Sequence, residues 1–195
     1  MIATAKMSRH IAKVAKGTHA FVLAVTSNTR GMVAGGFALI IPLMIMIYFG
    51  TIETTNAMTA SRRVTNVAQT AADLTAQAAS VDTSDINDIF AASTAILTPF
   101  PASAIKITIT SVVANSSNAT TVGWSKAYGT GATALSTGKA VVLPAGLTTA
   151  NSSVVMVTVT YTYTSPIATY ITGPIVMTET AYLKPRRSVS VAFSS

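Results

Sequence analysis

The stretch RGMVAGGFALIIPLMIMIYFG, from Arg30 to Gly50, is the longest apolar segment of the chain and decides its fold class. From Met32 to Ile52 the only ionisable side chain is the phenol of Tyr48, and these 21 residues would span roughly 30 Å as a helix. This length matches the hydrocarbon core of a bilayer, whereas helices of soluble proteins rarely stay uncharged for so long. The run therefore predicts a transmembrane helix over residues 32–52, with a kink at Pro42, which removes one backbone hydrogen bond.

The basic residues are concentrated in front of this run. Thirteen Lys and Arg residues stand against six Asp and Glu residues, and five of the thirteen precede the run without any acid among them. By the positive-inside rule, residues 1–31 form a cytoplasmic leader and the chain after Glu53 is exported. The remaining eight basic and six acidic residues give the rest of the chain a net charge of about +2. This part has no basic patch with aromatic side chains for stacking on bases, so nucleic acid is not an expected partner. A secretory signal peptide is disfavoured, because its apolar core is shorter and a cleavage site of small residues follows it.

A second helical pattern follows the membrane run. Small and aliphatic side chains recur every three or four residues, which predicts an amphipathic helix over residues 53–81 that continues the membrane helix. We call this set the stripe; it consists of Ala60, Val64, Val67, Ala71, Leu74, Ala78 and Val81. Two interpretations fit the stripe equally well. It packs either against the protein's own domain or, as a seam, against helices of partner proteins.

Residues 82–195 have the pattern of a small β-rich head. DTSDINDIF supplies N-cap candidates at Asp82, Thr83 and Ser84 for a short helix. The alternating stretches AIKITIT, VVMVTVTYTY and IVMTETAYL predict three strands, VSVAF is a candidate fourth, and NSSNATTVG and YGTGATALSTGK are predicted as turns. The predicted fold class is α+β: a long N-terminal helix, membrane-spanning in its first half, carries a small β-rich head in the manner of a lollipop.

Catalytic and metal-binding constellations are missing from the predicted head. His10 and His19 both lie in the leader and the chain has no Cys, which removes the usual nucleophilic triads and most transition-metal sites. Asp82, Asp85 and Asp88 are spaced by three residues, and Asp85 and Asp88 are expected to charge the first helical turn rather than to bind calcium. We therefore expect no enzyme, no catalytic residue, no cofactor, no metal and no small-molecule substrate.

The N-terminal third resembles the signature of TadE-like proteins of the tight-adherence (Flp, type IVb) pilus system. The positions that match at the expected spacing are Gly31, Phe37, Ala38, Leu39, Pro42, Gly50 and Glu53. VTVTYTYTSP and IVMTETAYLKPRRSVSV are similar to the closing strands and basic ending of the family. Gly36 departs from the pattern, which has Glu there. In prepilins that Glu pairs with the N-terminal amine of a neighbouring subunit.

The resemblance implies a pilin-like fold and cleavage by a prepilin peptidase between Gly31 and Met32. It also implies a single-pass protein of the bacterial inner membrane, with a cytoplasmic N-terminus and a periplasmic head. Such a chain would act as a minor pilin or pseudopilin, packing with other pilins and the pilus assembly machinery, either at the membrane or within the pilus. The alternatives are the principal filament subunit, disfavoured because such subunits are far smaller, and a membrane-tethered binding or adhesin domain unrelated to pili.

Overall fold

The computed structural model describes residues 29–165 and 173–194. Its first element is the helix α2 (Thr29–Gln77), which contains Pro42. The chain divides into two compact units between Ile52 and Glu53. In the first unit the helix carries no acidic residue, and the Thr51 hydroxyl donates to the carbonyl of Ile47 at 2.8 Å, so this polar group needs no water.

In the second unit, α2 ends at Gln77, four residues before the predicted end. Ser80–Val81 form the strand β1, which pairs in parallel with β6 (Ala192–Phe193). The backbone of the C-terminal segment takes the free carbonyls at the helix end, because Arg186 N donates to Ala76 O at 2.9 Å and Ala192 N donates to Ala79 O at 3.2 Å. Long-range pairing, which helical periodicity does not reveal, therefore terminates this helix.

The second helix of the head is α3 (Thr83–Ala95), followed by the short 3-10 helix η1 (Ala102–Ala104). Asp82 is its N-cap: its Oδ1 accepts from Asp85 N at 2.8 Å, and Asp85 Oδ2 accepts from Asp82 N at 3.0 Å. This capping box confirms the expected cap at Asp82 and the expected acid in the first turn at Asp85. The expectation for Asp88 is wrong, because α3 begins at Thr83 and Asp88 therefore lies beyond the first turn.

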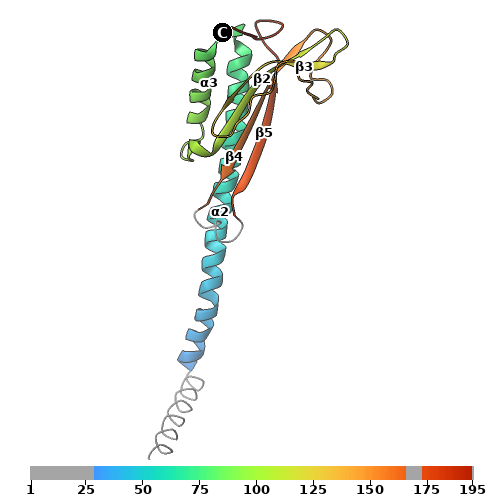
Figure 1. Cartoon of the computed structure of the whole chain (residues 1–195). Helices are drawn as coiled ribbons and strands as arrows, with labels where there is room; N and C mark the ends of the chain where they lie inside the picture. Colours follow the sequence, from blue (N-terminus) through green and yellow to red (C-terminus); the bar gives the residue numbers. More distant parts are fainter. Residues whose placement is uncertain (1–28, 166–172, 195) are drawn as a thin grey trace, which may run out of the picture. The chain divides into compact units, whose positions relative to one another are not determined.

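Four antiparallel strands form the sheet of the head, in the order β3-β2-β4-β5 (Figure 1). They are β2 (Ile105–Ala114), β3 (Thr120–Tyr128), β4 (Ser153–Tyr163) and β5 (Ile175–Leu183). The sequence predicted β2, β4 and β5 but not β3, whose first residues were assigned to a turn. Gly123 and Lys126 interrupt its apolar alternation, and its pairing with β2 changes register between Ser111 and Val112. The predicted α+β class, a long N-terminal helix followed by a β-sheet head, is confirmed.

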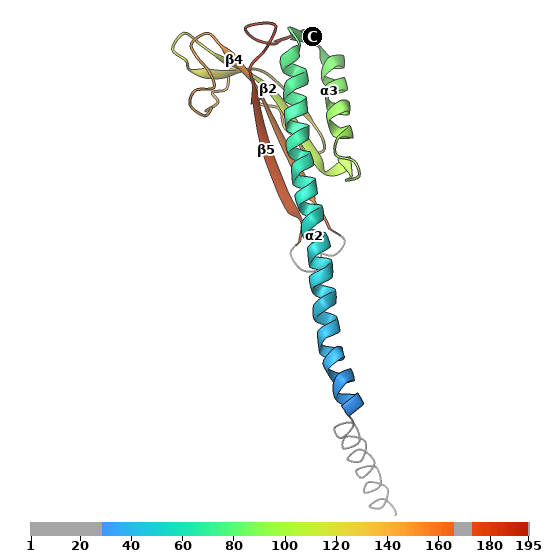
Figure 2. The ribbon, with the colours of Figure 1, turned by 180° about the vertical axis from the view of Figure 1, so that it is seen from behind.

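One face of the sheet packs against α3 and the second-unit part of α2, which lie in front of it in Figure 2. Every second residue of β2 and β4 is buried there, including Ile107, Ile109 and Val157. Threonines occupy the opposite face, where the hydroxyls of Thr160 and Thr178 lie 3.2 Å apart. This alternation is the expected pattern for an antiparallel sheet covered on one face.

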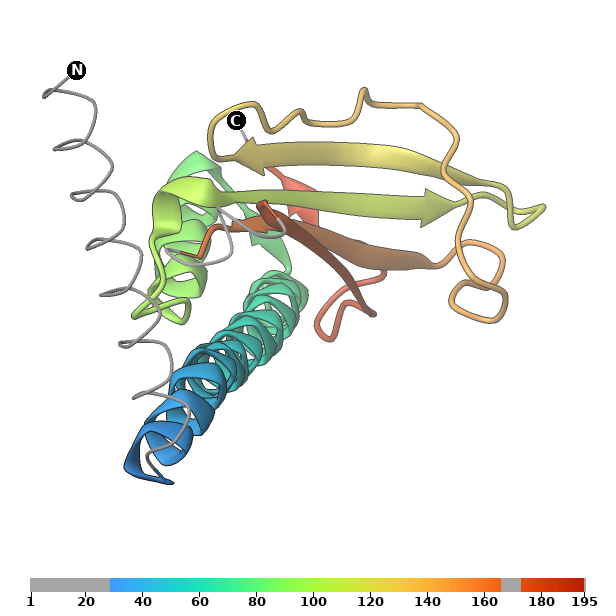
Figure 3. The ribbon, with the colours of Figure 1, turned by 90° about the horizontal axis from the view of Figure 1, so that it is seen from below.

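The two edges of the sheet differ. The segment after β3 runs along that strand (Figure 3), and Val122 N donates to Lys139 O at 2.9 Å while Val141 N donates to Thr120 O at 3.1 Å. Within residues 29–165 and 173–194, β5 has a strand neighbour on one side only, namely β4. The β3 edge is therefore closed by the protein's own chain, whereas β5 is an edge strand.

Candidate membrane and assembly surfaces

The first unit presents an apolar helix that no described part of the chain covers. Its large hydrophobic side chains are between 38% and 81% exposed; they are Phe37, Leu39, Ile40, Ile41, Leu43, Met44, Ile45, Met46, Ile47, Tyr48, Phe49 and Ile52. By length and composition it can cross a membrane, and none of its most apolar window is buried. Because a contiguous apolar surface of this size is unfavourable in water, the segment requires lipid or partner helices around it.

The predicted processing site lies inside α2. Gly31 and Met32 both have helical backbone, so their peptide bond must leave the helix to enter a peptidase active site. Glycine lowers helix stability by about 1 kcal/mol relative to alanine, and Gly31, Gly35 and Gly36 all fall in this short stretch. The local sequence therefore favours the unwinding that cleavage would need.

Gly36, the position that departs from the family pattern, has free space around it. A Cβ atom at Gly35 or Gly36 would meet no atom within 4 Å, and the same holds at Gly50. Of the other motif positions, Phe37, Leu39 and Pro42 lie on the exposed apolar part of α2. The fold therefore leaves room for the usual glutamate at 36, and its absence has no steric cause in the described chain.

Glu53, the last motif residue, begins the second unit and contacts the end of β4. Tyr163, the last residue of β4, lies near the carboxylate of Glu53, whose Oε1 is buried without a hydrogen-bond partner. Burial, followed by the interaction with the Glu53 carboxylate and its negative charge, raises the pKa of Tyr163 to about 12. Phe100 packs edge-on against the Tyr163 ring at 5.9 Å between centroids. The motif glutamate therefore joins the first residue of the head to its sheet.

The stripe lies in the hydrophobic core of the head. Ala60, Val64, Val67 and Ala71 are completely buried, Val81 is 1% exposed, and Leu74 and Ala78 are partly buried against the same core. Val81 belongs to β1 rather than to the helix. Packing against the protein's own sheet and α3 therefore accounts for the stripe, and its four fully buried members offer no surface to a partner helix.

The buried face of α2 is wider than the stripe. Ala68, Ala72, Thr75 and Ala76 are at most 1% exposed, and the Thr75 hydroxyl is satisfied by the carbonyl of Ala71 at 2.8 Å. These four residues lie outside the predicted stripe, because a stripe of one residue per turn describes only a narrow helix contact. Ala68 and Ala72 each follow a stripe residue by one position. Such neighbouring small residues indicate a broader buried face, as expected where a sheet covers the helix.

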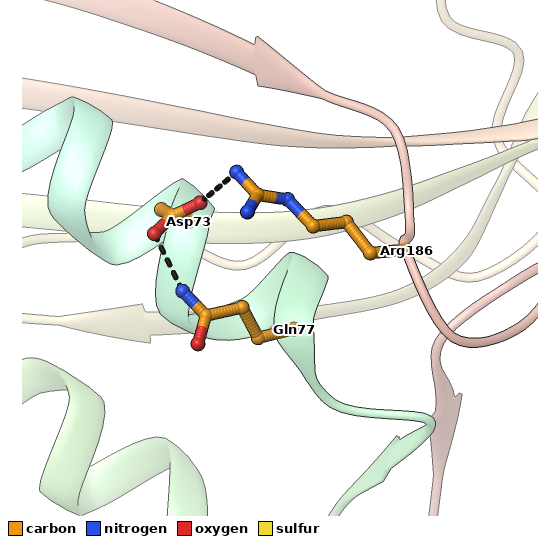
Figure 4. A network of polar contacts seen from close by, with 3 residues as sticks. All are labelled: Asp73, Gln77 and Arg186. Atoms are coloured by element: carbon orange, nitrogen blue, oxygen red, sulfur yellow. Dashed lines mark hydrogen bonds and ion pairs between the residues drawn. The ribbon is translucent and has the colours of Figure 1, made fainter.

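A polar network ties the C-terminal segment to the end of α2 (Figure 4). Arg186 donates to Oδ1 of Asp73 at 2.5 Å, and Gln77 donates to Oδ2 of the same carboxylate at 2.6 Å. The two charged side chains are 59% and 38% exposed, so the ion pair contributes at most about 1 kcal/mol. It fixes the position of the segment between β5 and β6. In the sequence Arg186 is recognisable only as part of a basic ending, and local pattern does not identify Asp73 as its partner.

Across the part of the chain that the structure describes, no group of three or more His, Cys, Asp or Glu side chains could hold a metal ion. His10 and His19 lie outside the described residues.

A family model described as TadE-like protein matches residues 36–73. Comparison with curated proteins finds no match, and neither does comparison with solved structures. The matched stretch starts at Gly36, covers the exposed apolar helix and ends at Asp73 in the buried stem of the head. It indicates a protein associated with tight-adherence pili that has an N-terminal apolar helix. The resemblance to TadE-like proteins drawn from the sequence is thereby confirmed over these residues.

Proposed function

We propose that the chain is a minor pilin or pseudopilin that helps to assemble tight-adherence pili, acting by packing and recognition without turnover. The observation that carries this proposal is the uncovered apolar helix of bilayer length, which follows a basic leader and lies in the stretch matched by the TadE-like family. The leader would remain in the cytoplasm and the head would lie on the periplasmic side of the bacterial inner membrane.

In this proposal the apolar helix has two successive roles. It first anchors the chain in lipid, and after removal of the leader it packs against helices of other pilins. Gly35, Gly36 and Ala38 are small residues clustered near the start of this segment, and small residues let transmembrane helices approach closely. Since the stripe is already buried within the head, partner contacts of the helix would fall on residues 35–52.

Processing by a prepilin peptidase is the step that tests the proposal. N-terminal sequencing of the membrane-bound chain should give Met32 as first residue when the peptidase is present and Met1 when it is absent. Gly31→Leu should leave the precursor intact, because the added side chain obstructs close approach of the peptidase to the backbone. Gly50→Leu is the matched control: it puts the same side chain at a glycine of the same helix that has free space around it, and it should mature normally.

Normal maturation of Gly31→Leu would show that this bond is not the processing site. A chain that keeps its leader and functions in cells without other pilus subunits would instead favour the membrane-tethered binding domain. The threonine-lined outer face of the sheet, with the hydroxyl pairs Thr158–Thr180 and Thr160–Thr178, would be the surface to examine in that case.

The glycine at position 36 gives a second test of assembly. Gly36→Glu would introduce the family's usual carboxylate at a position with room for it, and the charge could pair with the new amine of Met32 on a neighbouring subunit. We expect this variant to be cleaved at least as well as the present sequence and to co-purify more strongly with other pilus subunits. Unchanged co-purification would remove the charge-pairing idea and leave the processing proposal standing.

A further inference from the structure

Three of the seven asparagines in the sequence begin an Asn-x-Ser or Asn-x-Thr triplet. This triplet is the acceptor of N-linked oligosaccharides in exported proteins when it lies on the surface. All three asparagines are exposed and lie together in the head. Asn115 and Asn118 belong to the turn between β2 and β3, and Asn151, just before β4, donates its backbone N–H to Asn115 O at 3.1 Å. A chain rich in Ser and Thr contains such triplets by chance, so the free groups of each triplet decide which of them can react.

Two of the triplets have lost the group by which a transferase recognises them. A site that hydrogen-bonds the hydroxyl at the third position rejects a triplet in which this hydroxyl is not free. Thr120 Oγ1 donates to Val141 O at 2.6 Å, and Ser153, which is 2% exposed, donates from Oγ to Val189 O at 2.6 Å. The asparagines of these two triplets have φ of 61° and 59°, in the left-handed region that asparagine enters more readily than most residues. Turn conformation therefore accounts for both of them.

The triplet Asn115-Ser116-Ser117 keeps both of its reacting groups free. Oδ1 of Asn115 accepts from Ser117 N and from Ala119 N, each at 2.9 Å, and so holds the turn. Within residues 29–165 and 173–194, no hydrogen bond of the protein uses Nδ2 of Asn115 or the hydroxyl of Ser117, and both side chains are exposed. Aspartate could accept the same two bonds, so the turn needs the side-chain oxygen but not the amide nitrogen.

We propose that Asn115 is the acceptor of an N-linked oligosaccharide, transferred from a lipid pyrophosphate carrier on the exported side of the membrane. Nδ2 attacks the anomeric carbon of the sugar, the bond from that carbon to the pyrophosphate oxygen breaks, and the pyrophosphate lipid leaves with the bonding electrons. One Nδ2 proton passes to a base of the transferase. The two N–H groups that donate to Oδ1 stabilise negative charge on the amide, which makes this proton easier to remove.

The acceptor position suits a large hydrophilic group. Asn115 directly follows β2, and all the residues from 115 to 119 that connect it to β3 are exposed. Only 10% of the sequence is charged, although charged surface groups are what normally keeps a protein soluble. An oligosaccharide would supply the hydration that so few charges leave missing. The modification is additional to the proposed role in pilus assembly and requires only that the head be exported.

Peptide mapping of the full-length chain, purified from the membranes of its source cells, tests this assignment. The tryptic peptide from Ile107 to Lys126 contains both asparagines of the turn. We expect this peptide to carry a mass increase made of whole sugar residues, and electron-transfer fragmentation to place it on Asn115. Asn115→Asp keeps the oxygen that holds the turn, and Ser117→Ala removes an unbonded hydroxyl; each should abolish the increase. Ser117→Thr should retain it, and so should Asn118→Asp, the matched control in the same turn.

Protease added to spheroplasts, which reaches only exported parts of the chain, separates this assignment from the proposed topology. An unmodified Asn115 in a head that the protease degrades would overturn the assignment and leave the topology standing. A head protected from the protease would contradict both. Sugar found only on Asn118 or Asn151, or a mass increase that persists in Asn115→Asp or Ser117→Ala, would also overturn the assignment. So would its loss in Ser117→Thr or Asn118→Asp, because these variants keep the acceptor triplet intact.

Discussion

Replacing Val67 tests the assignment of the stripe to the core of the head. Val67 is fully buried between α2 and the sheet, and Val67→Ala removes two methyl groups from this site. At about 0.8 kcal/mol for each buried carbon plus a cavity term, the loss in free energy of unfolding should be about 2 kcal/mol. Val67→Asp adds an unpaired charge in an apolar environment, which raises the loss to roughly 4 kcal/mol or more, a large part of the 5–15 kcal/mol typical of a domain.

Gln69→Asp is the control on the same helix, because Gln69 is exposed. Gln69→Asp should lower the free energy of unfolding by less than about 1 kcal/mol. This loss comes from the lower helix propensity of Asp and from its repulsion with Asp73, four residues further along the helix. Urea unfolding of the full-length chain in detergent micelles measures these differences. The fluorescence of Trp124, the single Trp of the sequence, is the signal, since its ring is 9% exposed and its Nε1 donates to Val191 O at 2.7 Å.

Equal unfolding midpoints for Val67→Ala and Gln69→Asp would refute the assignment. A stripe that served only partner helices would leave unfolding of the dilute chain unchanged while abolishing pilus assembly. Destabilisation of the isolated chain by the two Val67 variants, in the order Ala then Asp, would agree with the core seen in the structure.

Three further outcomes follow from charge and hydrogen bonding. A reporter enzyme fused after Ser195 should be active only outside the cytoplasm, and cytoplasmic activity would contradict the proposed orientation. The head should lose stability as the pH rises from about 10 to about 12: the raised pKa of Tyr163 makes the folded state hold its proton more tightly, so the stabilisation is complete below pH 10 and disappears through 12. Tyr163→Phe should flatten this part of the urea-midpoint profile, and an unchanged slope would show that the titration of Tyr163 does not cause the loss. Arg186→Ala should lower the free energy of unfolding by less than about 1 kcal/mol, because its ion pair with Asp73 is exposed; a loss of several kcal/mol in the same urea assay would show that the pair is much stronger than its exposure suggests.

Local sequence by itself determined the parts of this protein that depend on composition and period. The uncharged run from Met32 to Ile52 specifies an apolar helix whatever surrounds it, because its length and hydropathy are properties of consecutive residues. The period-two patterns specify β2, β4 and β5 in the same way, and Asp82 with Asp85 specifies the start of α3.

Only the tertiary structure decided what those elements contact. The stripe had two equally good partners in the sequence, and the sheet of the head covers it. The end of α2 at Gln77, the addition of β3, and the pairs Tyr163–Glu53 and Arg186–Asp73 all join residues far apart along the chain. Such contacts depend on how the strands and helices come together in space, and a periodicity read over one turn or one pleat contains no information about that arrangement.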